Sequence, residues 1–218
     1  MRACEIGGRT CFLSAEAPAE FMLIQAIDAR DESGPDAQAE RIARLSGADF
    51  RMAAFAVDDW NDGLSPWPAP PVFGDKGFGG GGEATLDFLL DRLLPQVAGP
   101  EERLILGGYS LAGLFALWAA TRTDRFEAVA AASPSVWYPG WTAYLMAHPV
   151  RARRVRLSLG EREPRARNPV MARVGECALA TQEILSDYLD STFEWNPGNH
   201  FTDPGPRTAR AFARAMGD

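Results

Sequence analysis

One serine in this chain stands where it could act as a nucleophile. Ser110 lies in GGYSLAG, directly after the apolar run RLILGGY, and it opens SLAGLFALWAAT, whose small and apolar residues are typical of a buried helix. A sharp turn between a strand and a helix lifts a serine hydroxyl above the sheet, and the helix N-terminus favours negative charge beside it. The Leu111 amide is then expected to donate to an oxyanion. The plainer alternative is that Ser110 only caps the helix.

Small residues around Ser110 are consistent with such a turn. Gly108 stands two residues before the serine, where a side chain would crowd the backbone. The usual G-x-S-x-G pattern has a second glycine two residues after the serine, but Ala112 occupies that place and Gly113 follows it. Because alanine is small, this is a minor departure from the pattern.

The chain has two histidines, so few residues could serve as a general base. His200 lies in NPGNHF, a segment after the last predicted strand and before the last predicted helix, where hydrolases with this chain order place their base. His148 precedes Pro149 near the end of a short predicted helix, a position that favours surface exposure or contact with the helix C-terminus. We therefore predict His200 as the base, the alternative being a loop histidine bonded only to backbone.

A carboxylate is needed to orient the histidine and to stabilise its protonated form. The segment VRLSLGEREP supplies Glu161 and Glu163 just after a predicted strand. Both could instead belong to a solvated turn in which Arg162 and Arg165 are their partners. From the residues alone, either glutamate could be the acid.

The elements around these residues predict an α/β fold. Two segments, 3–8 and 10–15, predict a hairpin at the sheet edge that turns at Gly7 and Gly8. Beyond them, apolar runs short enough for buried strands alternate with segments of helical periodicity. The predicted strands are 21–27, 50–57, 103–109, 126–133, 155–160 and 189–195, and the predicted helices are 37–45, 85–95, 110–121, 141–147, 170–186 and 207–216. This alternation predicts a mainly parallel sheet with helices on both faces, which binds ligands at the carboxyl ends of its strands.

The segment 58–82 interrupts this alternation. It is rich in proline and contains the run GFGGGG, so we predict an irregular loop over the active site. Aromatic residues in this loop and in the segment 137–141 could bind a planar acyl or alcohol group, the alternative being that they pack in the core. The predicted substrate contacts are Trp60, Trp137 and Tyr109, with Trp67, Tyr138 and Trp141 as further aromatic residues of these segments.

Length and composition narrow the class of protein. The chain has 218 residues, of which 46% are apolar, and we expect one domain over 1–218. A formal net charge of -7 argues against a nucleic-acid partner, because phosphate backbones are bound by concentrated Lys and Arg. The N-terminus lacks the apolar core of a signal peptide, and no segment approaches the roughly 20 apolar residues that cross a bilayer. We therefore expect a cytoplasmic protein with no membrane partner.

Metal and nucleotide chemistry find no support in the sequence. The two histidines are far apart, and there is no H-E-x-x-H motif. The run GFGGGG lacks the spacing and the lysine of a phosphate-binding loop. We expect no metal and no cofactor, and the sequence does not indicate an oligomeric state.

Four segments together resemble a known family. GGYSLAGLFALW, SPSVWY, LGEREP and NPGNHF occur in this order, and they are similar to the enterochelin-esterase-like branch of the esterase D family of α/β-hydrolases. The resemblance extends from Phe21 to the C-terminus. It implies an α/β-hydrolase fold, a three-layer sandwich, and ester or thioester hydrolysis through an acyl-enzyme. It also implies Ser110 as the nucleophile and His200 as the base.

The resemblance implies further site residues. Siderophore esterases carry their acid in a G-x-x-E-P segment, which Gly160 to Pro164 match, and this favours Glu163 over Glu161. Their oxyanion loop follows the strand that corresponds to residues 21–27, which implies the Ile27 amide as the second donor, an amide near Trp60 being the alternative. The larger siderophore esterases have an extra N-terminal domain with no counterpart here, so we do not expect a ferric siderophore as the substrate.

These observations predict a serine hydrolase for a small-molecule ester. Ser110, His200 and Glu163 would form the triad, and the Leu111 and Ile27 amides would hold the oxyanion. Two alternatives stay open. The same acyl-enzyme could pass its acyl group to an alcohol, sugar or amine, which would make the protein an acyltransferase. A catalytically silent domain could also keep the fold and the pocket and only bind ligands.

Overall fold

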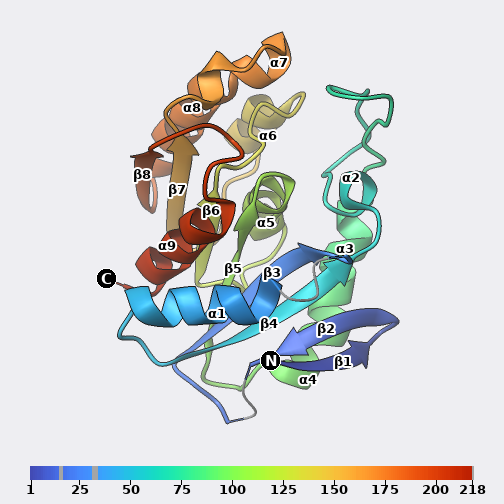
Figure 1. Ribbon diagram of the computed structural model, residues 1–218, viewed down its shortest axis with the longest axis vertical. Coiled ribbons are helices and arrows are strands. Elements are labelled where there is room, and N and C mark those ends of the chain that lie inside the picture. The colour runs from blue at the N-terminus through green and yellow to red at the C-terminus, as the bar shows by residue number, and fades with distance from the viewer. Residues whose placement is uncertain (15–16, 31–33, 218) are drawn as a thin grey trace.

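The computed structural model describes residues 1–14, 17–30 and 34–217 (Figure 1). Its centre is an eight-stranded sheet with the strand order β1-β2-β4-β3-β5-β6-β7-β8. The strands β3 to β8 run parallel, whereas the hairpin of β1 and β2 lies at one edge and pairs antiparallel with β4. The strands are β1 (Arg2–Ile6), β2 (Arg9–Leu13), β3 (Phe21–Asp28), β4 (Phe50–Val57), β5 (Arg103–Tyr109), β6 (Ala128–Ala132), β7 (Arg154–Gly160) and β8 (Asp190–Asn196).

Helices cover both faces of the sheet. On one face α1 (Gly34–Leu45) and α9 (Pro204–Met216) lie side by side and bury an apolar cluster that includes Ile42 and Phe212. The opposite face is covered by α3 (Gly82–Phe88), α4 (Leu94–Val97), α5 (Leu111–Arg122), α6 (Trp141–Ala147) and α8 (Val174–Ser186). The predicted three-layer α/β architecture is therefore confirmed.

The central elements are apolar on all sides because they are covered on all sides. Every residue of β6 is buried, and so is every residue of α5 from Leu111 to Thr121. A parallel strand between two helical layers, and a helix that is apolar all round, both have this character. Near-continuous apolar runs in the sequence thus become the middle of the sheet and the helix that follows β5.

The structure corrects two predicted elements. The segment 58–82 is not wholly irregular, because it contains the one-turn helix α2 (Trp60–Gly63), capped by the Asp59 side chain, and a bridge between Ala69 and Phe78. The predicted helix 170–186 is divided at Arg173, where ψ is -2°, into α7 (Pro169–Ala172) and α8. A ψ near 0° does not continue an α-helix, so the chain changes direction there.

Smaller differences concern helix and hairpin ends. The predicted helix 85–95 is a longer stretch in which the π-helical turn η1 (Leu89–Leu93) joins α3 to α4. The helix α9 begins at Pro204 rather than at Arg207, because proline fits the first turn of a helix. Ala15, at the end of the predicted hairpin, lies outside the described residues.

Parallel strands bring three distant loops to one edge of the sheet. The strand β5 ends one residue before Ser110, β7 ends three residues before Glu163, and β8 ends at Asn196, four residues before His200. All three loops therefore leave the sheet at its carboxyl edge, where open α/β sheets bind ligands. Within the described part of the chain, no helix combines the length and apolar character needed to cross a bilayer.

Candidate active site

Ser110 lies at the turn between β5 and α5 in a strained conformation. Its φ is 59° and its ψ is -121°, a region that residues other than glycine rarely adopt. Its amide donates to the Ala132 carbonyl at 3.1 Å, and its carbonyl accepts from the Ser135 amide at 3.0 Å. Its side chain makes no capping hydrogen bond to α5, so the capping alternative has no support. A serine held in this way has the geometry of a nucleophile elbow.

The elbow requires glycine at position 108. A Cβ on Gly108 would lie only 2.6 Å from the Cβ of Ala112, closer than two carbon atoms can approach. Because Gly108 has no side chain, the methyl group of Ala112 fits between the end of β5 and the first turn of α5. This contact explains how the turn tolerates alanine where the usual pattern has glycine.

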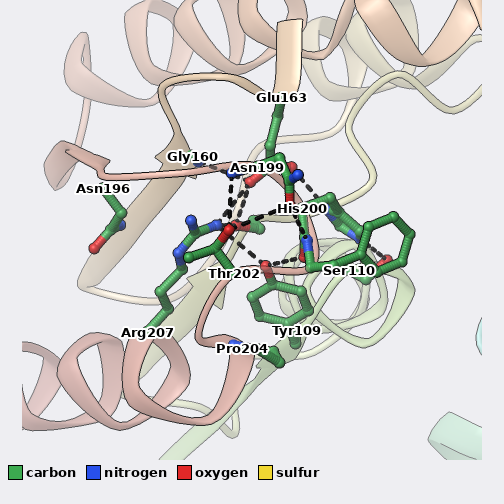
Figure 2. A network of polar contacts seen from close by, with 12 residues as sticks. Tyr109, Ser110, Gly160, Glu163, Asn196, Asn199, His200, Thr202, Pro204 and Arg207 are labelled. Atoms are coloured by element: carbon green, nitrogen blue, oxygen red, sulfur yellow. Dashed lines mark hydrogen bonds and ion pairs between the residues drawn. The ribbon is translucent and has the colours of Figure 1, made fainter. Parts of the chain in front are cut away.

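His200 contacts both Ser110 and Glu163 (Figure 2). Its Nε2 lies 3.0 Å from the Ser110 Oγ, and its Nδ1 lies 2.7 Å from the Glu163 Oε2. The Glu163 side chain is 3% exposed and the His200 side chain 21%. In this arrangement the carboxylate can keep a proton on Nδ1, which leaves Nε2 free to take the proton of the serine.

The carboxylate of Glu163 is held by several donors. Its Oε1 accepts from the Ser133 hydroxyl and from the Gly160 amide, each at 2.7 Å, and lies 3.1 Å from the guanidinium of Arg207. Burial raises the pKa of Glu163, but the hydrogen bonds from His200, Ser133 and Gly160 outweigh it and hold the pKa below its usual value. Glu163 is therefore ionised at neutral pH and acts as an acceptor only.

Neither Glu161, the alternative acid, nor His148, the alternative base, lies at Ser110. Glu161 is exposed, and its backbone amide donates to the Asn196 carbonyl at 2.9 Å. His148 follows α6, where its ring stacks on Tyr144 with 4.1 Å between ring centroids. Of the two glutamates and the two histidines, the structure brings only Glu163 and His200 to the serine.

Ser110 and His200 line a cavity of about 690 Å³. Aromatic side chains from the segment 58–82 and from the segment after β6 form part of its wall, and arginines from the loop after β7 form another part. The lining residues are Trp60, Asn61, Phe73, Phe78, Ser110, Leu111, Ser135, Trp137, Arg162, Glu163, Arg165, Ala166, Arg167, Asn168, Met171, Asn199, His200 and Phe201. Among the described residues, no group of His, Cys, Asp and Glu side chains is arranged to hold a metal ion.

Two of the predicted substrate contacts, Trp60 and Trp137, line this cavity. The other three tryptophan and tyrosine residues of these segments pack instead. The Trp67 ring nitrogen donates to the Pro139 carbonyl at 2.9 Å, and the Tyr138 hydroxyl donates to the Trp67 carbonyl at 2.6 Å. Trp141 is buried. The aromatic residues therefore divide between cavity wall and core.

Tyr109, the third predicted substrate contact, has a different place. It is not among the residues that line the cavity, and its hydroxyl donates to the His200 carbonyl at 2.7 Å. Its ring lies 5.1 Å from the His200 ring, centroid to centroid. Tyr109 thus supports the loop that carries the histidine, and a contact between its side chain and the substrate stays a prediction.

The predicted oxyanion donors also differ in their surroundings. Leu111 lines the cavity as the first residue of α5, so its amide has no partner within the helix. Ile27 does not line the cavity. The amides of Phe21 and Ala29 in and after β3 donate to carbonyls on the β4 side, and the two-residue period of a strand directs the Ile27 amide to that side as well. The Ile27 amide therefore points away from β5 and Ser110. Trp60, near which the alternative second donor was expected, lines the cavity.

The sequence analysis predicted no role for three residues of this site. Ser135 lines the cavity with its Oγ 3.2 Å from the Ser110 Oγ, and Ser133 and Arg207 contact Glu163. The sequence held one signal for Arg207, which lies on the same predicted helix face as Ala211 and Ala215 at four-residue spacing. A charged residue on an otherwise apolar face needs a buried partner.

Comparison with known proteins identifies the fold. No family model and no curated protein matches the sequence. An IroE-like serine hydrolase from Shewanella oneidensis superimposes with a TM-score of 0.70 over 94% of this chain and 75% of its own, at 16% identity. The siderophore hydrolase EstB from Aspergillus nidulans gives 0.68 over 99% and 93%, at 19% identity. The enterobactin esterase FES from Shigella flexneri gives 0.65 over 95% and 55%, at 16% identity.

This chain has the α/β-hydrolase fold. Within that fold, enzymes with a nucleophile elbow carry their triad in the chain order serine, acid, histidine. Ser110, Glu163 and His200 follow this order, each in a loop at the carboxyl edge of the sheet. The α/β-hydrolase fold thus accounts for the position of each group that the geometry has brought together.

Proposed function

We propose that this protein is a serine hydrolase that cleaves a carboxylic ester or thioester through an acyl-enzyme. The observation that carries the proposal is the unbroken line of contacts from Ser110 through His200 to Glu163, at a cavity large enough for a small molecule. Fold neighbours named serine hydrolase, siderophore hydrolase and enterobactin esterase support the same class of chemistry.

In the proposed reaction, the Ser110 Oγ attacks the ester carbonyl while the His200 Nε2 takes its proton. Glu163 stabilises the imidazolium, and the Leu111 amide donates to the oxyanion, with an amide near Trp60 as the second donor. His200 then gives the proton to the leaving alcohol, and the acyl group stays on Ser110. Water attacks this acyl-enzyme with His200 again as base, which releases the acid and restores the serine.

The cavity favours an ester that combines a planar apolar group with a negative charge. Aromatic rings offer flat apolar surface on one part of the wall, and the arginines bring positive charge to another. Among the described lining residues, Glu163 is the only carboxylate, and Arg207 lies against it. The aromatic residues are Trp60, Phe73, Phe78, Trp137 and Phe201, and the arginines are Arg162, Arg165 and Arg167.

The expectation against a ferric siderophore loses its basis. It rested on the extra N-terminal domain of the larger siderophore esterases. This chain covers 93% of the solved chain of the siderophore hydrolase EstB, so the structural match to a siderophore hydrolase does not depend on that domain. Ferric siderophores therefore belong in a substrate screen, beside aromatic esters with and without a carboxylate.

We further propose that residues 1–218 act as one domain in which the segment 58–82 covers the active site. Trp60, Asn61, Phe73 and Phe78 of this segment all line the cavity. Trp67 and the segment after β6 exchange hydrogen bonds, which hold the loop against the rest of the site.

Labelling with a fluorophosphonate probe tests the proposed nucleophile. We expect a single adduct on Ser110, located by mass spectrometry, that is lost in Ser110→Ala and forms at least about a thousandfold more slowly in His200→Ala. Ser186→Ala and His148→Ala are matched controls, since each removes an exposed side chain of the same type outside the cavity, and both should label like the parent protein.

Two outcomes would contradict the proposal. An adduct on Ser135 would move the nucleophile to the neighbouring hydroxyl. No adduct in folded protein would favour a catalytically silent binding domain. If Ser110 labels, esters should then be assayed with and without added alcohol or amine acceptors, because transfer to an acceptor would identify an acyltransferase.

A further inference from the structure

Arg207 is a buried arginine in the first turns of α9, and no step of the proposed reaction uses it. Its side chain is 1% exposed, and Figure 2 shows its guanidinium within the polar network of Glu163 and Tyr109. The Nη1 lies 3.1 Å from the Glu163 Oε1 and 3.2 Å from both the Ser133 Oγ and the Tyr109 Oη. The Nη2 donates to the Pro197 carbonyl at 2.6 Å. One side chain therefore contacts three separate loops.

These contacts reach His200 by two routes. Pro197 and His200 belong to the same loop between β8 and α9, and Arg207 holds the Pro197 carbonyl directly. The Tyr109 Oη accepts from Arg207 and donates its own proton to the His200 carbonyl at 2.7 Å. Arg207 thus fixes the backbone of the histidine loop at two points, and at the same time it holds the carboxylate to which the imidazole is bonded.

Gly160 leaves the space in which Arg207 and Glu163 meet. A Cβ on Gly160 would lie 2.8 Å from the Arg207 Nη1 and 2.9 Å from the Glu163 Oε1. The Gly160 amide donates to that same carboxylate oxygen. The glycine at the start of the G-x-x-E-P segment is therefore required by the arginine as much as by the glutamate.

The charge of Arg207 changes the balance at the site. Glu163 and Arg207 form an ion pair with both side chains almost fully buried, so the cluster is neutral while His200 is neutral. When His200 takes the proton of Ser110, the cluster becomes positive. A carboxylate without Arg207 would instead pass from negative to neutral. The positive charge of Arg207 therefore disfavours a protonated His200. At the same time, the contacts of Arg207 hold Glu163 and the His200 loop in place.

We propose that Arg207 is a positioning residue of this site, which fixes Glu163 and the His200 loop and places a buried positive charge beside the carboxylate that contacts His200. The inference rests on the proposed hydrolase function. The charged and titratable groups around His200 and Glu163 are Tyr109 from β5, Arg207 from α9, and Arg162, Arg165 and Arg167 from the loop after β7, which line the same cavity. Of these, only Arg207 has an ion pair with the carboxylate.

Substitution of Arg207 separates its charge from its geometry. In Arg207→Met we expect kcat to fall about 10- to 100-fold with KM changed less than about threefold, because the triad loses its alignment. The acidic limb of the kcat/KM profile should move to higher pH by about one unit, because the opposing charge is gone. Arg207→Lys should restore the acidic limb but not kcat, since one ammonium cannot replace the guanidinium contacts.

Arg156→Met is the matched control for the loss of a buried arginine. The Arg156 side chain is 8% exposed and pairs with Asp190 at 2.7 Å, without contact to the triad. This variant should lose stability but keep the kcat and pH profile of the parent protein per folded molecule. Equal effects of Arg156→Met and Arg207→Met on kcat would reduce Arg207 to a structural role and overturn the proposal.

Tyr109→Phe tests one arm of the network with a small change. It keeps Arg207 and its charge but removes the hydroxyl that links it to the His200 carbonyl. We expect kcat to fall about three- to tenfold with an unchanged acidic limb, because only alignment is affected. If Arg207→Met does not fold, this variant and Arg207→Lys decide, and parent-like kcat in both would overturn the proposal.

Nuclear magnetic resonance of the histidine rings gives a readout that does not need activity. The chain has two histidines, so His148→Gln assigns the signals of His200. In Arg207→Met the ring signals of His200 should shift from their positions in the parent protein at the same pH, whereas those of His148 should not. If the ring shift occurs but no ester is cleaved and Ser110 does not label, the proposed function fails and the catalytic part of the inference fails with it, whereas the effect of Arg207 on His200 remains. If Ser110 is active but neither the His200 ring signals nor kcat change, Arg207 is not a positioning residue.

Discussion

Two buried arginine–glutamate pairs lie at opposite ends of the sheet. Arg51, near the start of β4, pairs with Glu102, which directly precedes β5, so this pair lies at the amino ends of the parallel strands. Glu163 and Arg207 pair at the carboxyl ends. Both carboxyl groups are buried, and both have a pKa below the ordinary value because hydrogen bonds outweigh burial, which alone would raise it. Burial and pKa direction therefore do not distinguish them.

The pairs differ in how the carboxylate oxygens are used. Arg51 bonds both oxygens of Glu102, at 2.6 and 2.7 Å, and the amides of Ala19 and Gly99 bond one oxygen each. In Glu163 the donors from Arg207, Ser133 and Gly160 converge on Oε1, which leaves Oε2 to His200. One carboxylate is enclosed as a structural clamp, whereas the other keeps an oxygen for the histidine. Two pairs that share burial and pKa direction therefore differ in the partners of their individual carboxylate oxygens, and in Glu163 one oxygen contacts a histidine.

The largest expected difference concerns catalysis. Glu163→Gln should lower kcat about 10³- to 10⁴-fold, because a neutral amide neither selects the histidine tautomer nor stabilises the imidazolium. Glu102→Gln should keep the kcat of the parent protein per folded molecule. The rate of fluorophosphonate labelling and the hydrolysis of an active ester both measure this contrast. A similar loss of kcat in the two variants would remove the distinction between the pairs.

The same two variants should lose similar stability at neutral pH. Each leaves a buried arginine without its carboxylate, which costs about 3–5 kcal/mol in the free energy of unfolding. The folded pKa of both carboxyls lies below the ordinary value of 4.5, so their contribution is fully present above that pH and is lost as the pH falls through the folded pKa. Urea unfolding at pH 7, 4 and 3 should therefore show parent and variants converging, and a constant difference would contradict the assigned ionisation.

Arg51→Lys tests the pair at the amino ends of the strands. Lysine keeps the charge but cannot bond both oxygens of Glu102, so we expect a loss of about 1–2 kcal/mol in the free energy of unfolding and no change in kcat. Arg207→Lys, in contrast, is expected to change kcat. Thermal unfolding and ester hydrolysis by the two variants measure the contrast. A reduced kcat in Arg51→Lys would connect the far end of the sheet to the site.

The smallest expected effect is that of Ser133→Ala. It removes one of the donors to the Glu163 Oε1 while Gly160 and Arg207 remain. We expect a loss of about 1 kcal/mol in stability and a fall of kcat of about threefold. Steady-state kinetics beside Glu163→Gln measure the difference, and equal losses in the two variants would mean that Ser133 alone fixes the carboxylate.

The fold class, the sharp turn at Ser110 and the proximity of His200 to that serine could all be predicted from the sequence. These follow from short-range patterns, since apolar runs, helical periodicity and the small residues Gly108 and Ala112 act on their own neighbours. The chain order of the strands then brings the loops to one edge, because parallel strands share a carboxyl end. No residue contact had to be known for these predictions.

Which side chains meet at that edge depends on long-range packing. Glu161 and Glu163 are two residues apart in one loop, and the path of that loop after β7 exposes one and buries the other against His200. The direction of the Ile27 amide depends on the pairing of β3 with β4, which no local pattern reveals. Arg207 is 44 residues from Glu163 in the sequence, and it becomes part of the site because α9 packs across the sheet. Side-chain direction and long-range packing are properties of the assembled sheet, so the chain's local patterns could not contain them.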